Sequence, residues 1–184
     1  MSIAGLVDVK RDVSALTVPD GDKVTLPEGH LVRVMQELGG NFTVQDHMGM
    51  RYRIEGRDAD AIGKPVPKAS SEKIEVDVFD KSSVENAVWR QLRKIHDPEI
   101  PFNIVDVGLI YEMKLEKVEE GTWQAKVVMT LTAPGCGMGE VLVNDVYEQL
   151  KKVPGVEGVD VDLVFDPPWS LDMLSEDAKM SLNL

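Results

Sequence analysis

The sequence predicts an α+β protein, in which a small all-β N-terminal domain precedes a C-terminal domain with the order helix, strand, strand, helix, strand. Two observations lead to this prediction. In the first 63 residues, short runs of alternating apolar and polar residues lie between glycine-rich turns. Beyond about residue 82, apolar residues recur at helical spacing in two segments and alternate in three others. We therefore place the domains at residues 1–63 and 83–184, and expect both helices on one face of the C-terminal sheet.

The N-terminal domain is expected to be a compact barrel or meander. Alternation over residues 32–34, 42–44 and 50–54 predicts three strands, which turns at 39–40 and 46–49 separate. Two more turns, rich in proline, glycine and acidic residues, flank a short segment that begins at Lys23 and ends at Leu26.

Residues 64–82 have the composition of a linker at both ends, because prolines occur at one end and serines at the other. Within this segment Ile74, Val76 and Val78 alternate with acidic residues. The segment is therefore either a linker or an edge strand.

The C-terminal elements follow in order along the chain. Ser82 or Ser83 is a candidate N-cap of a first helix that Asp97-Pro98 ends. Residues 109–115 and 123–131 alternate as two strands around an acidic turn. Residues 142–153 have the spacing of a second amphipathic helix, and residues 159–165 alternate as a third strand, with an irregular tail after it.

Composition excludes several classes of protein. Residues 1–75 hold 10 Lys+Arg against 12 Asp+Glu, and residues 76–184 hold 10 against 20, so the two parts carry charges of −2 and −10. Such an acidic second part argues against a nucleic-acid partner. A single cysteine excludes an internal disulfide, and no apolar run approaches the length that spans a membrane. We expect a cytoplasmic protein with no membrane partner.

The only cysteine, Cys136, lies in a glycine-rich turn between the second predicted strand and the second predicted helix. A strand that ends at Thr132 and a helix that begins near Glu140 would leave its sulfur close to a helix N-terminus, which lowers the pKa of a thiol. The resulting thiolate attacks electrophiles and binds metals. The alternative interpretation is a small buried thiol in a tight loop.

A second polar segment, residues 96–101, begins with His96 and contains Asp97 and Glu99. It follows the first predicted helix, and Pro98 favours an extended Asp97 that projects away from this helix as a surface carboxylate. The alternative is an ordinary Asp-Pro turn with solvated neighbours. Thr130 and Thr132 are expected on the sheet face opposite Met129, where a hydroxyl could donate to a thiolate or a sulfide.

The residue types do not complete a metal site of the usual kind. A closed zinc or iron-sulfur site needs about four protein ligands, but the chain has one cysteine and three scattered histidines. Any cluster must therefore be shared between two chains or with an external thiol. The chain also has no P-loop, no dinucleotide-binding fingerprint and no hydrolase or metalloprotease motif.

Four separated motifs resemble those of the metal-sulfur cluster biosynthesis domain shared by SufT, PaaD and eukaryotic cytosolic iron-sulfur targeting factors. They comprise residues 97–101, 104–111, 130–136 and 166–169, the last with Met173, Ser175 and Glu176 after it. Residues 38–44 and 58–63 resemble the N-terminal extension of the longer bacterial SufT proteins. The PaaD branch typically has further cysteines in its C-terminal tail. Residues 175–184 have none, which argues against that branch.

The resemblance implies an auxiliary factor in iron-sulfur protein maturation. It puts Cys136 in the position of the reactive cysteine and Asp97, Glu99 and Thr132 in motif positions beside it. The leading hypothesis is a non-enzymatic homodimer that helps to deliver an iron-sulfur cluster from a scaffold protein to client apoproteins, with the Cys136 thiolate as a transient ligand. Two alternatives stay open. One is a thiol enzyme with Cys136 as nucleophile and His96 or Asp97 as base. The other is an adaptor that binds clients without a cluster.

Overall fold

The computed structural model describes residues 5–67, 74–135 and 137–182 of the chain. The chain divides into two compact units, Met1–Glu72 and Lys73–Leu184, which we describe separately. Both α-helices and β-sheets are present, so the α+β class expected from the sequence is confirmed. Among the described residues, no helix is long and apolar enough to cross a membrane.

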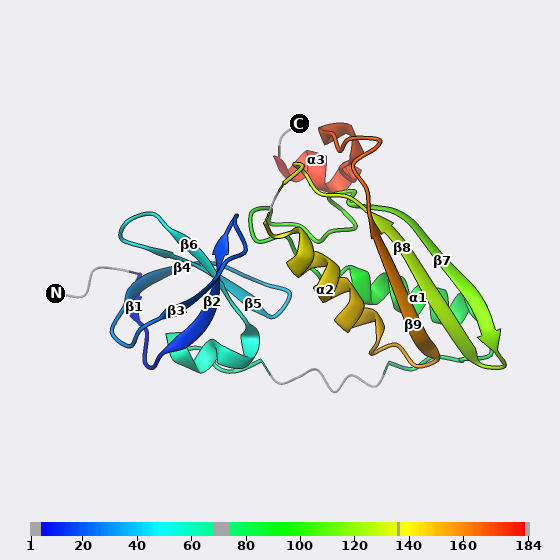
Figure 1. The fold of residues 1–184 in the computed structure, drawn as a ribbon, viewed down its shortest axis with the longest axis horizontal. Coiled ribbons are helices and arrows are strands. Elements are labelled where there is room, and N and C mark those ends of the chain that lie inside the picture. Colours follow the sequence, from blue (N-terminus) through cyan, green and yellow to red (C-terminus); the bar gives the residue numbers. More distant parts are fainter. Residues whose placement is uncertain (1–4, 68–73, 136, 183–184) are drawn as a thin grey trace. The chain divides into compact units, whose positions relative to one another are not determined.

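The first unit is built on one six-stranded antiparallel sheet with the order β1-β4-β5-β6-β2-β3 (Figure 1). Its core contains Phe42, Ile54 and Ile62, all almost fully buried. The strands β4, β5 and β6 form a meander, but β1 flanks it on one side and the β2-β3 hairpin on the other. The order is thus not that of a simple meander. Its elements are β1 (Leu6–Asp8), β2 (Val13–Val18), β3 (Lys23–Leu26), β4 (Leu31–Leu38), β5 (Asn41–Asp46), β6 (Arg51–Ile54) and the 3-10 helix η1 (Gly56–Ile62).

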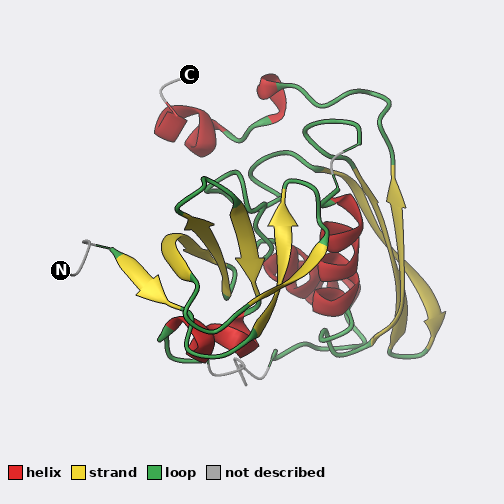
Figure 2. Cartoon of the chain, turned by 60° about the vertical axis from the view of Figure 1, so that its left-hand side comes forward, coloured by secondary structure: helices red, strands yellow, loops and turns green. Residues whose placement is uncertain are grey.

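The second unit has a three-stranded sheet with the order β7-β8-β9. The pair β7 and β8 is an antiparallel hairpin, whereas β8 and β9 run parallel and are connected through α2. The helices α1 and α2 lie on the same face of this sheet (Figure 2). The elements are α1 (Lys81–Leu92), β7 (Ile110–Glu119), β8 (Thr122–Met129), α2 (Gly139–Leu150), β9 (Val156–Leu163), the 3-10 helix η2 (Leu171–Met173) and α3 (Glu176–Leu182).

The helix α1 begins one or two residues before the predicted N-cap. Asp80 is the N-cap, because its carboxylate accepts from the backbone N–H groups of Ser82 and Ser83. The expectation of a serine N-cap was therefore wrong. Carboxylate and hydroxyl side chains cap equally well, so the sequence did not discriminate between them. The helix ends at Leu92, well before Pro98, and residues 93–96 form a turn and a bridge instead.

The segment before α1 belongs to the second unit and packs on its core. Ile74 and Val76 lie against its core, and the indole Nε1 of Trp123 donates to the carbonyl of Val78 over 2.8 Å. Residues 74–80 form no strand. The boundary between the two compact units lies between residues 72 and 73, within the segment that the sequence predicts as a linker or an edge strand.

The C-terminal tail is held against the loop that precedes β7. Trp169 Nε1 donates to Val107 O over 2.8 Å, and Ser175 N donates to Asp106 O over 2.8 Å. Gly108 has φ +78°, and a Cβ atom there would lie only 2.2 Å from Met173 O. Glycine is therefore required where the loop and the tail meet. Leu174 and Ala178 of the tail are buried in the core of the unit.

Candidate functional site

The described members of the predicted site, Asp97, Glu99 and Thr132, come from loops at one end of the second unit, where β8 and β9 end and β7 begins (Figure 1). Three backbone hydrogen bonds of 2.8 Å connect these loops: from Thr130 N to Leu109 O, from Val164 N to Met129 O, and from Ser175 N to Asp106 O. The loop before β7, the segment after β8 and the tail after β9 are thus fixed to one another.

Asp97 lies in a loop whose two ends are joined by backbone hydrogen bonds. His96 and Asn103 form an antiparallel bridge, and Ile104 N donates to Ile95 O over 2.9 Å. Within the loop the Oδ1 atom of Asp97 accepts from Glu99 N over 2.7 Å. Asp97 therefore stabilises a turn, which is the alternative role that the sequence analysis considered for it.

Asp97 and Glu99 differ in exposure, and the exposure of Asp97 differs from what the sequence predicts. Asp97 is only 6% exposed, so the expected surface carboxylate is in fact buried. The loop folds back at the His96–Asn103 bridge and carries Asp97 inward, which neither its polarity nor Pro98 revealed. Glu99 is exposed.

Sequence reasoning included residues 104–111 among the motifs but missed Asn103, which precedes them. Asn103 Oδ1 accepts from the backbone N–H groups of Val105 and Asp106, each over 3.0 Å, and its amide donates to the Asp106 carboxylate. These bonds fix the turn from which Leu109 reaches Thr130. An asparagine shortly before an aspartate in a glycine-containing segment was the available signal.

The two threonines after β8 have different environments. Thr130 is fully buried, and its Oγ1 has no hydrogen-bond partner among the described residues. Thr132 is half-buried. The strand ends at Met129, and residues 129, 130 and 131 are all buried. Thr130 and Thr132 both lie beyond the last residue of β8, so the predicted strand that ended at Thr132 was too long, and the alternation behind the expected placement of the two threonines does not extend to them.

Cys136 lies outside the described residues, so its predicted pKa and its role stay predictions. The residues around it form a glycine turn in which Gly135 has φ +82° with nothing within 4 Å of an added Cβ. The helix α2 begins at Gly139, close to the expected start, and its N-cap Met138 makes no side-chain hydrogen bond to the first turn. The amides of that turn retain the partial positive charge that favours an anion.

The glycine that begins α2 has a packing role. A Cβ atom at Gly139 would lie 2.7 Å from Leu131 Cδ1 and 3.6 Å from Leu163 Cδ2. The first turn of α2 therefore lies directly against Leu131, two residues beyond the end of β8, and against Leu163, the last residue of β9.

The described residues contain no group of three or more His, Cys, Asp or Glu side chains that could hold a metal ion. Asp97 and Glu99 thus form no such group with neighbouring described residues. A metal cluster bound here would need ligands beyond this part of the chain.

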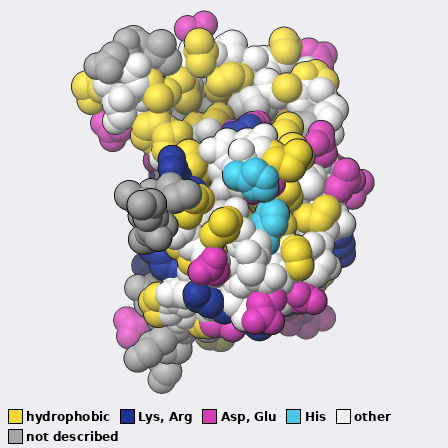
Figure 3. Space-filling view, turned by 90° about the vertical axis from the view of Figure 1, so that its left-hand side faces the viewer, with side chains coloured by type: hydrophobic (Ala, Val, Ile, Leu, Met, Phe, Trp, Pro, Cys, Tyr) yellow, Lys and Arg dark blue, Asp and Glu magenta, His cyan; other side chains and the backbone are white. Residues whose placement is uncertain are grey.

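The first unit contains a polar cluster of a different kind. The Asp46 carboxylate accepts from Met48 N and Met50 N, each over 2.9 Å, and from the hydroxyl of Tyr52 over 3.0 Å. Burial raises the pKa of Asp46, but these three donors and the nearby His30 outweigh burial and leave it below its usual value. His30 Nε2 lies 3.7 Å from Asp46 Oδ2. Figure 3 shows histidine side chains on one face of the molecule, among hydrophobic and acidic side chains.

Comparison with known proteins assigns a family to the second unit. Residues 85–162 match the family model described as iron-sulfur cluster assembly protein. The chain is 43% identical over 98 residues to a Porphyromonas gingivalis protein named Fe-S protein maturation auxiliary factor, a match that covers 53% of this chain and 90% of that protein. It is 38% identical over 88 residues to the Staphylococcus aureus Fe-S protein maturation auxiliary factor SufT, covering 48% of this chain and 96% of that one.

A solved structure of a Bacillus anthracis domain of unknown function is also similar. It has a TM-score of 0.50 and 34% sequence identity, and the match covers 56% of this chain and 94% of the other. The residues that match the family model all lie within the second unit. They include the loop before β7 and the turn between β8 and α2, but not the tail after β9.

Proposed function

Since this chain belongs to the family of iron-sulfur cluster assembly proteins and has a role in iron-sulfur protein maturation, we propose that it helps to transfer a cluster from a scaffold protein to client apoproteins through Cys136. The cluster is the cargo and not a resident cofactor. The Cys136 thiolate is its transient ligand on this chain, and no chemical reaction is catalysed.

One observation carries this proposal. The chain has a single thiol, which its sequence places three residues before the first residue of α2, and the described residues supply no metal-binding group of three or more. A cluster held by four protein thiolates would not leave easily, whereas one thiolate can exchange. The remaining ligands then come from a second copy of the chain, from a scaffold or client protein, or from a small thiol.

The other motif residues have supporting roles in this proposal. Asp97 shapes the loop before β7 through its bond from Glu99 N, and Glu99 offers an exposed carboxylate to the partner. The half-buried Thr132 offers a hydroxyl that can donate to a thiolate or a sulfide. A homodimer in which two Cys136 turns share one cluster would account for the missing ligands, and the cytoplasm is the compartment in which this transfer would take place.

The test is anaerobic reconstitution of the full chain with iron and sulfide, with both counted per chain. We expect charge-transfer absorption that Cys136→Ser abolishes, because a hydroxyl hardly ionises near neutral pH and is a poor ligand for iron. Ser170→Ala, at an exposed position in the tail, is the matched control and should retain the absorption. No absorption in the unchanged protein would count against the carrier role.

A second measurement distinguishes cluster transfer from the two alternatives, a thiol enzyme and an adaptor without a cluster. In a strain without the native protein, the activity of iron-sulfur enzymes under iron limitation should be restored by the unchanged chain and not by Cys136→Ser. Full restoration by the serine variant would favour an adaptor without a cluster. Rapid stoichiometric labelling of Cys136 by electrophilic substrate analogues, with no chromophore, would favour a thiol enzyme.

A further inference from the structure

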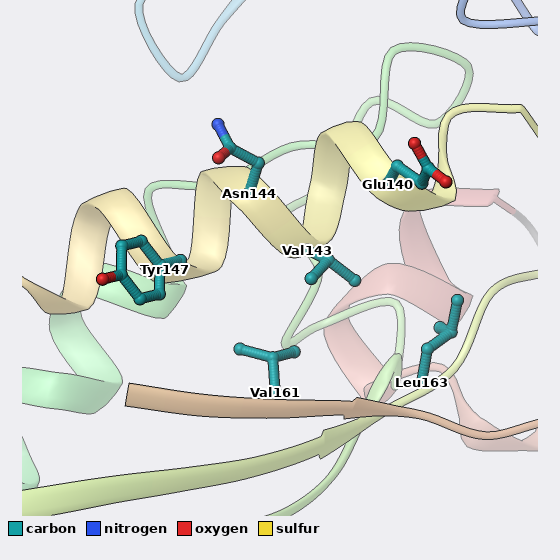
Figure 4. A pocket seen from close by; sticks show the side chains of 6 residues that line it. All are labelled: Glu140, Val143, Asn144, Tyr147, Val161 and Leu163. Carbon is teal, nitrogen blue, oxygen red and sulfur yellow. The ribbon is translucent and has the colours of Figure 1, made fainter. Parts of the chain in front are cut away.

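A groove of about 320 Å³ lies between α2 and the edge of the second sheet. Val143 of α2 faces Val161 and Leu163 of β9 across it, so its floor is apolar (Figure 4). The polar side chains stand along the helix. The groove is lined by Glu140, Val143, Asn144, Tyr147, Val161 and Leu163.

The strand β9 borders this groove as an edge strand. It pairs with β8 on one side, and no described residue pairs with it on the other. The edge of such a strand presents backbone N–H and C=O groups in a row, which is a template for a further strand. Eight residues, Val156–Leu163, form this edge. A partner segment of similar length could therefore pair along it and place alternate side chains over the groove.

The opposite face of β9 is acidic. Asp160 and Asp162 are exposed there and alternate with the apolar Val161. Lys126 of β8 lies opposite Asp160, and its pKa is raised mainly by the Glu116 carboxylate 2.8 Å away, with smaller contributions from Asp160 and Asp162. One lysine thus faces three carboxylates.

This excess of negative charge disfavours a second copy as the natural occupant. Two β9 strands that paired antiparallel about a two-fold axis would bring Asp160 and Asp162 of both copies to one face of the joined sheet. Like charges on neighbouring strands are destabilising, whereas lysine or arginine beside these aspartates is favourable. The exposed Glu140 at the end of the groove adds a further negative charge.

We propose that β9 and the groove beside it bind an extended basic segment of a partner protein, which adds to the sheet as a fourth strand. Its apolar side chains fill the groove over Val161 and Leu163, and its lysine or arginine side chains on the other face pair with Asp160 and Asp162. That the partner is a scaffold or a client rests on the proposed function, but the binding itself does not depend on Cys136.

The probe is a capped, fluorescent nine-residue peptide in which valine and lysine alternate, titrated with the full chain at low salt. We expect saturable binding that weakens as salt rises, because charge pairs contribute to it. A peptide with glutamate in place of lysine should bind at least about tenfold more weakly, a difference of about 1.4 kcal/mol. Equal binding of the two peptides would overturn the proposal.

Two variants locate the binding surface. Val161→Asp puts a charge into the groove and Asp162→Lys reverses an exposed charge, so each should weaken binding of the lysine peptide by about tenfold or more. Their matched controls, Val118→Asp and Glu119→Lys, lie on the other edge strand, β7, and should bind as the unchanged chain does. If the β7 variants weaken binding as much, the surface is wrongly placed.

A charge swap keeps the test decisive even if Val161→Asp does not fold. Asp162→Lys should prefer the glutamate peptide, which reverses the preference of the unchanged chain. Cys136→Ser should bind the lysine peptide as before, so loss of cluster binding and loss of docking are distinguished. A dimer of the unchanged chain that Asp162→Lys dissociates would show that a second copy occupies β9, contrary to the proposal.

Discussion

Two buried polar side chains, one in each unit, differ in how their hydrogen bonds are satisfied. Asp46 of the first unit accepts three hydrogen bonds, two of them from the backbone of the turn that it closes. Thr130 of the second unit is fully buried, and its hydroxyl has no partner among the described residues. Asp46 is thus a structural group that stabilises a turn. The Thr130 hydroxyl makes no comparable contact among the described residues, and it lies in the segment that leads to the cysteine turn.

The largest effect is expected at Gly108, where a packing contact allows no side chain. Gly108→Ala should lower the free energy of unfolding of the second unit by about 3 kcal/mol or more, because the new Cβ would meet Met173 O and φ is positive. Urea unfolding followed by tryptophan fluorescence measures this unit alone, since all three tryptophans, Trp89, Trp123 and Trp169, belong to it.

The matched control for that change is Gly135→Ala in the cysteine turn. Its φ is also positive, but an added Cβ would meet nothing within 4 Å. The cost there should be only the backbone term of about 1 kcal/mol. Equal losses at the two positions would mean that the tail does not press on the loop at Gly108.

Asp46→Ala should come next, because it removes three hydrogen bonds from the first unit. We expect a loss of about 2 kcal/mol in its free energy of unfolding, measured by hydrogen exchange of the amides in β5 and β6. Asp20→Ala changes an exposed aspartate in the turn between β2 and β3, and should stay within about 0.5 kcal/mol. Similar losses of unfolding free energy for the two variants would contradict the structural role of Asp46.

The same residue gives a pH dependence with a definite sign. The pKa of Asp46 is lowered in the folded protein, so its contribution is fully present above the unfolded value of about 3.9 and is lost as pH falls through the lower folded value. The difference in stability between the unchanged chain and Asp46→Ala should therefore be constant above about pH 5 and shrink below pH 4. A difference that grows on acidification would contradict the lowered pKa.

The smallest effect is expected at Thr130. Thr130→Val replaces a buried hydroxyl that has no described partner by a methyl group, so stability should stay within about 1 kcal/mol of the original or rise. Thr122→Val is the matched control, because Thr122 Oγ1 accepts from Glu119 N over 3.0 Å and its loss should cost about 1 kcal/mol. Tryptophan fluorescence reports both, and a greater loss at Thr130 would reveal a partner for its hydroxyl.

The sequence predicted the elements whose pattern is local. The helix α2 buries Leu142, Val146 and Leu150 at helical spacing, and β7 and β8 follow the alternation around an acidic turn. Strand β2 was missed, although Val13, Ala15 and Thr17 alternate there, because no glycine-rich turn marks its start. The predicted third strand ended two residues too late, since β9 stops at Leu163 and leaves Phe165 exposed.

The candidate site was less predictable, because its features arise where distant segments meet. Asp97 is buried by a loop that closes between His96 and Asn103, and Thr130 is buried beyond the end of its strand. The groove beside β9 forms between an edge strand and a helix face. The sequence pattern of the strand does not show which helix packs beside it, and the pattern of the helix does not show which strand does. Residue types alone therefore did not indicate how exposed these side chains are.

The tail that packs on Gly108 also defines how much of the chain a shortened version must keep. The family match ends at residue 162, before Trp169, Leu174 and Ala178, which contact the loop or fill the core. It also begins after Ile74 and Val76, which pack on the same core. A recombinant fragment trimmed to the matched boundaries would expose apolar surface at both ends and aggregate. The smallest fragment that should fold alone begins at residue 73 and retains α3.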